Sequence, residues 1–458
     1  MIENITTQRV LFKDVFDKPI HACFDQPDSS VDGGAILLKA ADTNLNLTGR
    51  LANCLIDRRD SGSVIHSYQE QLCQRVYGLA CGYEDCNDAA RLVNDPMHKL
   101  SVGRDPTIGL ALASQPTLCR FENAIDSRSL LRMAYQLAEV VIERHRQRLG
   151  EDCRLITIDM DPTDDATHGK QQLTLFNGYY DKWCYLPQAC FLNFDNETDH
   201  YLFAYQLRPG DVNATYGAIP ILKRIVPRLR QAFPKAKIRV RLDSGFATPE
   251  MFEFFDDHAL QYVVAFPSNT TLLDHAEPLM EQVRPKSVDS EQTEHLYGDC
   301  YYSARSWDTV RRVVIKAEVV RKEGGDPRDN ARFVVTNLTL APQHIYEKIY
   351  CARGDVENRI KELLYGMNID RTSCHRFFAN QFRGLLSAAA YVLMQELRLS
   401  AGDKTIAKAQ VSTLREKLLK MAVWITSSNR RVVLRLPVSA PWKWEWMRVA
   451  RNLGAVLE

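Results

Sequence analysis

Four aspartates lie within seven residues in the stretch LITIDMDPTDDATHGKQ, directly after an apolar run that is typical of a buried strand. They are Asp159, Asp161, Asp164 and Asp165. Carboxylates held this close raise one another's pKa and destabilise the fold unless a cation or a hydrogen-bond network neutralises them. The crowding therefore predicts a divalent metal site at the end of this strand.

Two acidic residues further along the chain could complete such a site. Asp243 ends the strand pattern KIRVRLD just before a glycine turn, and Glu357 lies in the helical pattern YCARGDVENRIKEL. Aspartates at the ends of two strands and a glutamate on a following helix can meet at one edge of a sheet. Three carboxylates there can hold two Mg²⁺ or Mn²⁺ ions about 4 Å apart, an arrangement that supports phosphoryl transfer.

The first of these carboxylates is either Asp159 or Asp161. Side chains alternate along a strand, so both residues point to the same face and both could reach a metal. We favour Asp159. Asp164 and Asp165 would then support the turn or orient His168, which we expect just outside the metal ligands.

The helix around Glu357 has a second stripe of residues beside its apolar one. Tyr350, Arg353 and Glu357 recur at intervals of three and four, so they should lie together next to the core face. On the residues alone, Arg353 and Glu357 can also be an ordinary ion pair worth roughly 0.3 kcal/mol. Gly354 indicates either close approach of another backbone or a late start of the helix.

The elements that must position these residues follow from changes in hydrophobic period. Residues 1–150 are mostly helical in pattern, and the last amphipathic run ends at Gly150. From Leu155 onward we predict a strand, then a two-strand pattern with an Asn177-Gly178 turn, and then a further strand. A helix, a strand, a helix and a strand follow, an order typical of an α/β domain with a ribonuclease H-like mixed sheet. The segment DPTIGLALASQPTLCRFENAID could be a helix-turn-helix or part of a plain helical bundle.

We therefore expect five regions along the chain. They are a helical N-terminal DNA-binding region (1–150), the first part of the catalytic core (151–267), a β-rich insertion subdomain (268–340), the second part of the core with Glu357 (341–395) and a basic C-terminal region (396–458).

Composition describes an ordinary globular chain with an uneven distribution of charge. The 458 residues carry a net charge of +1, with no apolar run long enough to span a membrane and no signal-peptide pattern, so we expect a cytoplasmic protein. Residues 223–241 contain eight Lys or Arg and no acid, and residues 404–451 contain eleven against two acids. Such runs are often solvated faces, but two of them favour a polyanionic partner. Cys73, Cys81 and Cys86 lack zinc spacing, so reduced structural thiols are expected.

Several motifs together resemble a known family. The series LASQPTLCRFEN, DMDPTDDATHGKQ, FNGYYDKWCYLP, LRPGD, RLDSGF, RFVVTNL and YCARGDVENRIKEL is similar to the DDE transposases of the insertion sequence 1380 family. The resemblance covers residues of about 100 to 395, with the motifs in the same order. That family belongs to the bacterial cut-and-paste transposases with a β insertion in a ribonuclease H-like catalytic domain.

The resemblance implies a Mg²⁺-dependent enzyme that binds the terminal inverted repeats of its element, cuts both ends and joins them to target DNA. It would act as a homodimer on paired ends, in a bacterial cytoplasm. Its catalytic triad would be Asp159 or Asp161, then Asp243 and Glu357. Tyr350 and Arg353 would contact DNA phosphate near the cut, and Trp307 would stack on a displaced base unless it is a core residue of the insertion.

Other DNA contacts are less defined by the resemblance. The lysine expected seven residues after the glutamate is Leu364 here, so Arg359 or Lys361 would substitute for it, and Arg241 adds a further candidate. Two alternatives remain: a ribonuclease H-like nuclease or resolvase without strand transfer, and a domesticated DNA-binding protein without catalysis.

Overall fold

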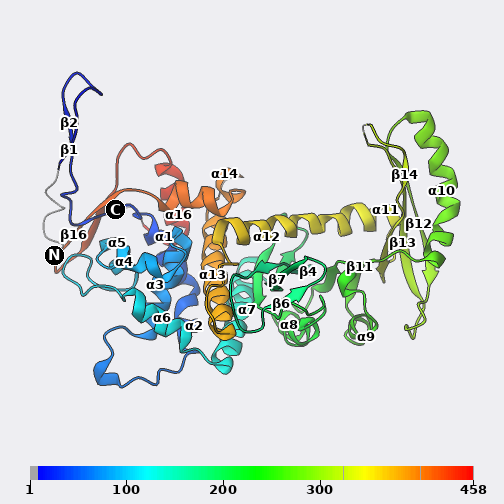
Figure 1. Cartoon of the computed structure of the whole chain (residues 1–458), viewed down its shortest axis with the longest axis horizontal. Coiled ribbons are helices and arrows are strands. Elements are labelled where there is room, and N and C mark those ends of the chain that lie inside the picture. The colour runs from blue at the N-terminus through cyan, green and yellow to red at the C-terminus, as the bar shows by residue number, and fades with distance from the viewer. Residues whose placement is uncertain (1–8, 323, 403, 457–458) are drawn as a thin grey trace. The chain divides into compact units, whose positions relative to one another are not determined.

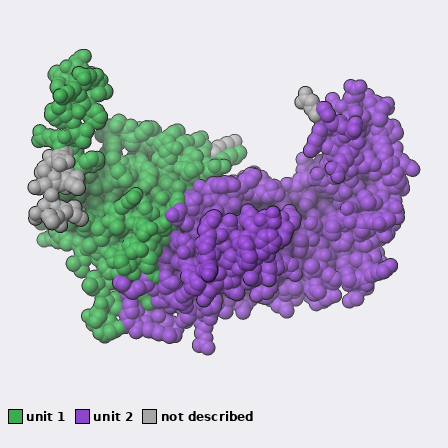
Figure 2. All heavy atoms as spheres, in the orientation of Figure 1, with its two compact units in different colours: residues 1–41, 60–119, 397–458 green, residues 42–59, 120–396 purple. Residues whose placement is uncertain are grey.

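The structure is a computed structural model that describes residues 9–322, 324–402 and 404–456. The chain divides into two compact units, each assembled from separate stretches of sequence (Figure 2). Unit 1 contains the described parts of 1–41, 60–119 and 397–458, and unit 2 contains 42–59 and the described parts of 120–396. All the acidic residues expected to bind metal belong to unit 2.

Unit 2 is built on a nine-stranded mixed sheet (Figure 1). Its strands are β4 (Leu155–Pro162), β8 (Gln188–Phe194), β9 (Tyr201–Gln206), β10 (Lys237–Leu242), β11 (Gln261–Phe266), β12 (Glu294–Tyr302), β13 (Arg311–Val320), β14 (Arg328–Asp329) and β15 (Arg332–Thr336). Eight of them follow the order β12-β13-β15-β11-β10-β4-β8-β9, and β14 pairs with β13. β10 runs parallel to both β4 and β11, and the remaining pairs are antiparallel.

The centre of this sheet is buried, as the apolar run before the aspartates predicts. The six residues 156–161 of β4 are all buried, and so is every residue of β8. In unit 2, α7 (Ser127–Leu149) precedes β4. The helices α8 (Ala218–Ala232), α9 (Pro249–Asp257) and α10 (Thr270–Ser290) connect strands of the sheet. Helix α7 begins at an Asp126 cap that accepts from Ser129 N and ends before Gly150, which has a φ of 61°, so the predicted glycine stop is confirmed.

Residues 268–340 are not purely β in structure. They begin with the 21-residue helix α10, and their strands β13 and β15 extend the main sheet through pairing of β15 with β11. Apolar side chains of α10, including Met280 and Val283, pack on Ala317 and Val319 of β13. The segment therefore lengthens the sheet that carries the aspartates.

Glu357 lies in an α-helix that is preceded by turns of different helical pitch. After α11 (Pro342–His344), residues Ile345–Tyr350 form a π-helix, Cys351–Arg353 form a 3₁₀ turn, and α12 (Gly354–Met367) follows. A Cβ added to Gly354 would meet nothing within 4 Å, so this glycine coincides with a late helix start rather than a close backbone approach. Helix α13 (Phe377–Leu399) comes next.

A small three-stranded sheet branches from the main one directly after β4. It contains β5 (Asp165–Ala166), β6 (Leu175–Asn177) and β7 (Lys182–Tyr185), in the order β5-β7-β6. β6 and β7 form the hairpin that the Asn177-Gly178 pair predicts, and Asn177 Oδ1 accepts from the backbone N–H groups of Tyr179 and Tyr180.

The remaining elements are mostly short. Those of unit 1 are β1 (Val10–Phe12), β2 (Ile20–Ala22), β3 (Ser29–Ser30), α3 (Tyr68–Cys81), α4 (Ala89–Leu92), α5 (Pro96–Ser101), α14 (Lys404–Ala407), α15 (Val411–Leu414), β16 (Val423–Ser427), β17 (Val432–Arg435) and α16 (Lys443–Asn452). Helix α2 (Leu47–Ala52) belongs to unit 2, and α1 (Ala35–Leu45) and α6 (Gln115–Asn123) contain residues of both units. Within the described residues, no helix is both long and apolar enough to cross a membrane.

Candidate functional site

Asp159 is neutralised within the sheet by an arginine on the neighbouring strand. β4 and β10 run parallel with Asp159 and Arg241 in register. Arg241 donates Nε to Asp159 Oδ1 at 2.7 Å and Nη2 to Oδ2 at 2.8 Å, and both side chains are buried. Because this bidentate pair engages both carboxylate oxygens, Asp159 has little capacity left for a cation.

The same arginine ties the sheet to the segment that leads to Glu357. Arg241 Nη1 donates to the carbonyl of Ile349 at 2.8 Å, in the π-helical turn before α12. His200 Nε2 lies 3.0 Å from Arg241 Nη2 and 3.5 Å from Asp159 Oδ2, and burial lowers the pKa of His200. The buried trio of Asp159, Arg241 and His200 therefore fixes β4, β10 and the π-helical turn relative to one another.

Asp161, Asp243 and Glu357 surround one guanidinium, that of Arg353. Arg353 Nη2 lies 2.8 Å from Asp161 Oδ1 and 3.4 Å from Asp243 Oδ2, and its Nη1 lies 3.5 Å from Glu357 Oε1. The three acids come from β4, the residue after β10, and the first turn of α12. The structure thus brings the ends of β4 and β10 and the first turn of α12 together at one place.

Local geometry holds each of these carboxylates at a different depth. Asp243 accepts from Gly245 N at 3.0 Å and so caps the 3₁₀ turn Ser244–Phe246. Its side chain is about a third exposed, that of Glu357 is more than half exposed, and Asp161 is buried. The site is therefore open on the side of Glu357 and closed under Asp161.

Burial and excess negative charge raise the pKa of Asp161 to about 7. Burial is the largest cause, and the charges of Asp243, Glu357 and Asp159 add to it, while Arg353 opposes it. Burial also raises the pKa of Asp243. One guanidinium thus leaves the three carboxylates incompletely neutralised.

The model of the family described as Transposase DDE domain group 1 matches residues 12–456. The chain belongs to this family. No curated protein matches the chain. The match supports a transposase role, and DDE transposases generally use divalent metal ions to cut DNA. Membership of the insertion sequence 1380 family is a finer assignment and stays a prediction.

The acidic residues of this transposase fit a divalent metal by their chemistry. Carboxylate oxygens are the ligands that Mg²⁺ and Mn²⁺ prefer, and three of them face a single positive charge. Within the described part of the chain, three possible ligand atoms lie within 4.8 Å of one another only at Asp32, Cys81 and His98. The carboxylates of Asp161, Asp243 and Glu357 are therefore spread around Arg353 and would have to draw together around an ion.

The group of Asp32, Cys81 and His98 belongs to unit 1, and protein side chains already neutralise its aspartate. Asp32 is fully buried, and its oxygens lie 2.7 Å from Lys420 Nζ, 2.7 Å from Tyr83 OH and 2.9 Å from His98 Nε2. Burial raises the pKa of the Cys81 thiol, which keeps the sulfur protonated. Since an ammonium already pairs with Asp32, we interpret this cluster as a buried ion-pair network.

The structure places two proposed DNA contacts in the interior of unit 2. Trp307 is 8% exposed and packs edge-on against Phe252 and Phe266, with ring centroids 5.2 and 5.1 Å apart. Arg241 is buried in the pair with Asp159. The burial of Trp307 agrees with the alternative that it is a core tryptophan, and both residues expose little surface to a ligand.

The other residues singled out in the sequence differ in their exposure and in their partners. Tyr350 is half-buried, and Arg359 is paired with Glu362 at 3.0 Å. Lys361 and His168 are exposed. Asp164 pairs with Lys182 at 2.7 Å, and Asp165 accepts from the Thr372 hydroxyl, so the structure gives these two aspartates partners other than His168.

The basic run 223–241 is not a continuous cationic surface. Arg239 and Arg241 are buried, and Arg228 and Lys235 pair with Glu139 and Glu151. Its exposed members without an acidic partner among the described residues include Lys223, Arg224 and Lys237. Only part of the run is therefore available to a polyanion.

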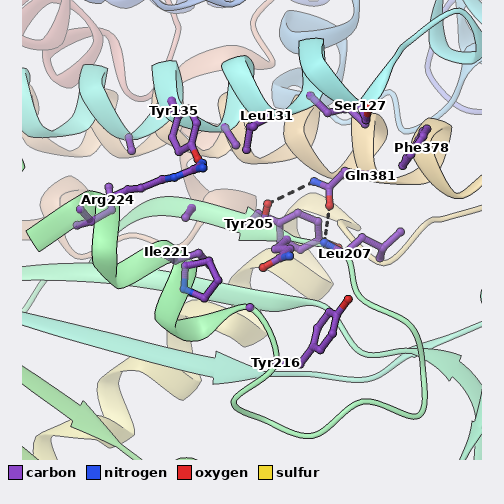
Figure 3. Close-up of a pocket in the computed structure, with 18 of the residues that line it drawn as sticks. Ser127, Leu131, Tyr135, Tyr205, Leu207, Tyr216, Ile221, Arg224, Phe378 and Gln381 are labelled. Atoms are coloured by element: carbon purple, nitrogen blue, oxygen red, sulfur yellow. Dashed lines mark hydrogen bonds between the residues drawn. The ribbon is translucent and has the colours of Figure 1, made fainter. Parts of the chain in front are cut away.

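An apolar cavity of about 540 Å³ lies elsewhere in unit 2, between α7, β9, α8 and the start of α13 (Figure 3). Gln381 donates to Tyr205 O and accepts from Leu207 N at its rim, and the Arg224 guanidinium lies 4.4 Å from the centre of the Tyr135 ring. None of the three carboxylates around Arg353 lines it. The cavity is therefore separate from the acidic site.

Proposed function

We propose that this transposase binds the terminal inverted repeats of an insertion sequence of the 1380 family, cuts the DNA and joins the ends to a target. Its metal ligands would be Asp161, Asp243 and Glu357, in a ribonuclease H-like domain. The observation that carries the proposal is the contact of one guanidinium, that of Arg353, with all three acids. A three-stranded antiparallel meander followed by two parallel strands, in the order β9-β8-β4-β10-β11, supports that fold.

The choice of Asp161 over Asp159 rests on their partners. Asp159 is engaged at both oxygens by Arg241, whereas Asp161 faces Asp243 and Glu357 across Arg353. In this assignment Asp159 is a positioning residue, because its arginine also holds the π-helical turn that precedes Glu357. The sequence alone favours Asp159, whereas the partners of the two residues favour Asp161, which we propose as the ligand.

Two Mg²⁺ or Mn²⁺ ions held by these acids would activate the attacking oxygen and stabilise the leaving oxygen in phosphoryl transfer. Arg353 and Tyr350 would hold the scissile phosphate, since Arg353 can leave the acids for a phosphate once a metal neutralises them. Lys361, on the exposed face of α12, would contact the DNA backbone. Action as a homodimer on paired ends is part of the same proposal.

Single substitutions of the acids test this assignment. We expect Asp161→Asn, Asp243→Asn and Glu357→Gln to reduce Mg²⁺-dependent cleavage of a supercoiled plasmid bearing both element ends to background. Asp355→Asn changes another exposed acid in the same turn of α12 and should leave cleavage intact. Retained cleavage in Asp243→Asn would overturn the proposal.

Asp159→Asn should behave differently from the three ligand variants. Removing this carboxylate leaves Arg241 buried without its charged partner, which typically costs about 3–5 kcal/mol of folding free energy. We therefore expect a lower unfolding temperature for Asp159→Asn and an unchanged one for Asp161→Asn, measured by thermal unfolding. The reverse pattern would make Asp159 the metal ligand.

The same plasmid assay separates the alternatives. Excision and joining of the ends indicate a transposase, cleavage without preference for the ends indicates a nuclease or resolvase, and binding without cleavage indicates a DNA-binding protein that has lost catalysis.

A further inference from the structure

Three aromatic side chains are exposed on the small sheet that follows β4. Phe176, Tyr179 and Trp183, which we call the hairpin aromatics, are 48%, 88% and 60% exposed. Phe176 and Trp183 are cross-strand partners on β6 and β7, with ring centroids 6.1 Å apart in an edge-to-face arrangement. Large aromatic surfaces left in water are costly, and a group of them usually marks a binding surface.

The hairpin aromatics are held close to the acidic site. β5 begins three residues after the end of β4 and pairs with β7, and Thr163 N donates to Pro187 O. β6 and β7 can be followed near the label of β4 in Figure 1. Burial raises the pKa of Tyr180, in the same hairpin, to about 12, and the nearby charges of Asp164, Asp161 and Asp243 contribute to this rise. Lys182 of β7 also pairs with Asp164, three residues after Asp161, so the hairpin is held next to the end of the strand that carries one of the three proposed metal ligands.

Hydrogen bonds fix the hairpin in place. Asn177 Nδ2 donates to Gly210 O at 2.6 Å, and both the N–H and the hydroxyl of Thr167 donate to Trp183 O. A Cβ on Gly210 would lie 2.1 Å from Cys184 O and 2.5 Å from Leu175 O, so the backbone of the 210 loop packs directly on both strands. Such a preorganised surface loses little conformational entropy when it binds a ligand.

The chemistry of this surface matches unpaired nucleobases. Flat aromatic faces bind bases by stacking, whatever their identity, and the faces of paired bases inside a duplex are not accessible. The residue first expected to stack on a displaced base, Trp307, is buried among Phe252, Phe266 and Tyr302. The hairpin aromatics supply exposed rings on the small sheet that follows the end of β4, the strand that carries Asp161.

We propose that the hairpin aromatics bind unpaired bases of the DNA strand that enters the acidic site. This inference rests on the proposed function, because the closeness of the hairpin to Asp161 and Asp243 is informative only if those acids act on DNA. It adds a base-stacking surface with Trp183 as its main contact.

Metal-free binding measurements on the full chain test the inference. Anisotropy of a labelled 20-nucleotide oligo-dT in EDTA is compared with that of an abasic oligonucleotide of the same length, which keeps the phosphates but has no bases. We expect Trp183→Ala to weaken oligo-dT binding about 5- to 100-fold, the usual loss for one stacking side chain, with less than twofold change for the abasic strand. Trp183→Phe should retain most of the binding.

Tyr301→Ala provides a matched control. Tyr301 is 75% exposed on the edge strand β12, which is separated from β4 by β13, β15, β11 and β10. Its removal should leave both affinities unchanged.

Three results would overturn the inference. The first is unchanged oligo-dT binding in Trp183→Ala, and the second is an equal loss of affinity for the abasic strand. The third is that Trp183→Ala converts a dimer to a monomer in sedimentation, which would assign the surface to a second copy of the chain. Because the assay contains no metal, these results are independent of cleavage. A wild-type protein that binds oligo-dT through Trp183 but does not cut plasmid would instead overturn the proposed function.

Discussion

At the scale of single residues, the acids differ in how much positive charge lies next to them. Asp159 has a bidentate arginine to itself, while Asp161, Asp243 and Glu357 share one guanidinium. A buried carboxylate with a dedicated counter-ion contributes to folding only if that pair stays intact. A group of acids that lacks enough positive charge is suited to bind a cation that the chain does not itself supply.

Asp165 offers a separate test of buried charge at this scale. It is 1% exposed, lies 2.8 and 3.0 Å from the Thr372 hydroxyl, and burial raises its pKa to about 8. A carboxyl whose pKa is higher in the folded than in the unfolded state binds its proton more tightly when folded. Its contribution to stability is therefore present at low pH and is lost as the pH rises from about 4 to about 8.

We expect Asp165→Asn to remove this part of the pH dependence. Between pH 5.5 and 8, the free energy of unfolding of the wild type should fall by about 2–3 kcal/mol more than that of the variant. This follows because one carboxyl that is protonated in the folded state and ionised in the unfolded state changes that free energy by at most roughly 1.4 kcal/mol per pH unit. Urea unfolding at the two pH values measures the difference. Equal declines in both proteins would show that Asp165 ionises normally.

At the scale of elements, the segment before Glu357 changes its helical pitch at the point where Arg241 of the sheet is hydrogen-bonded to it. Arg241 bonds to the carbonyl of Ile349 within the π-helical turn, and α12 begins at Gly354, four residues after that turn ends. A π-helical turn shifts the face that later residues present relative to a regular α-helix. This local geometry brings Arg353 and Glu357 to the aspartates.

Two glycines in consecutive helices should respond oppositely to alanine. A Cβ at Gly354 of α12 meets nothing within 4 Å, whereas a Cβ at Gly384 of α13 would lie 2.1 Å from Tyr205 Cε1. We expect Gly354→Ala to raise the free energy of unfolding by about 0.5–1 kcal/mol and Gly384→Ala to lower it by about 1–3 kcal/mol. Chemical denaturation compares the two variants, and a destabilised Gly354→Ala would contradict an unobstructed helix start at Gly354.

At the scale of the whole molecule, the net charge of +1 does not describe how the basic residues are distributed. Lys223 and Lys237 are exposed without an acidic partner among the described residues, while Lys235 in the same run pairs with Glu151 at 3.1 Å. Binding to duplex DNA releases about one counter-ion for each phosphate that a free cation contacts. The unpaired lysines are therefore the ones that should influence salt dependence.

We expect the double variant Lys223→Gln/Lys237→Gln to bind duplex DNA with a weaker dependence on salt. The slope of log affinity against log salt should decrease in magnitude by about 1.8 if both lysines contact phosphate. Lys235→Gln is the control, since its charge is already paired. An unchanged slope in the double variant would place the DNA on another surface.

The sequence by itself indicates the α/β class, the strand that carries Asp161, the strand that ends before Asp243, the hairpin at Asn177 and the helical segment of Glu357. These features follow from hydrophobic period and turn residues, which are local properties. The family match to residues 12–456 agrees with the transposase interpretation. Alternation along a strand places Asp159 and Asp161 on one face and cannot distinguish them.

Only the tertiary structure separated these two aspartates. Arg241 is 82 residues from Asp159 along the chain and reaches it because β10 lies parallel to β4 in a register that no local pattern specifies. The burial of Trp307 and the exposure of Trp183 were also decided by packing. Both are aromatic residues in strand-rich sequence, and only their neighbours in space determine which one faces water.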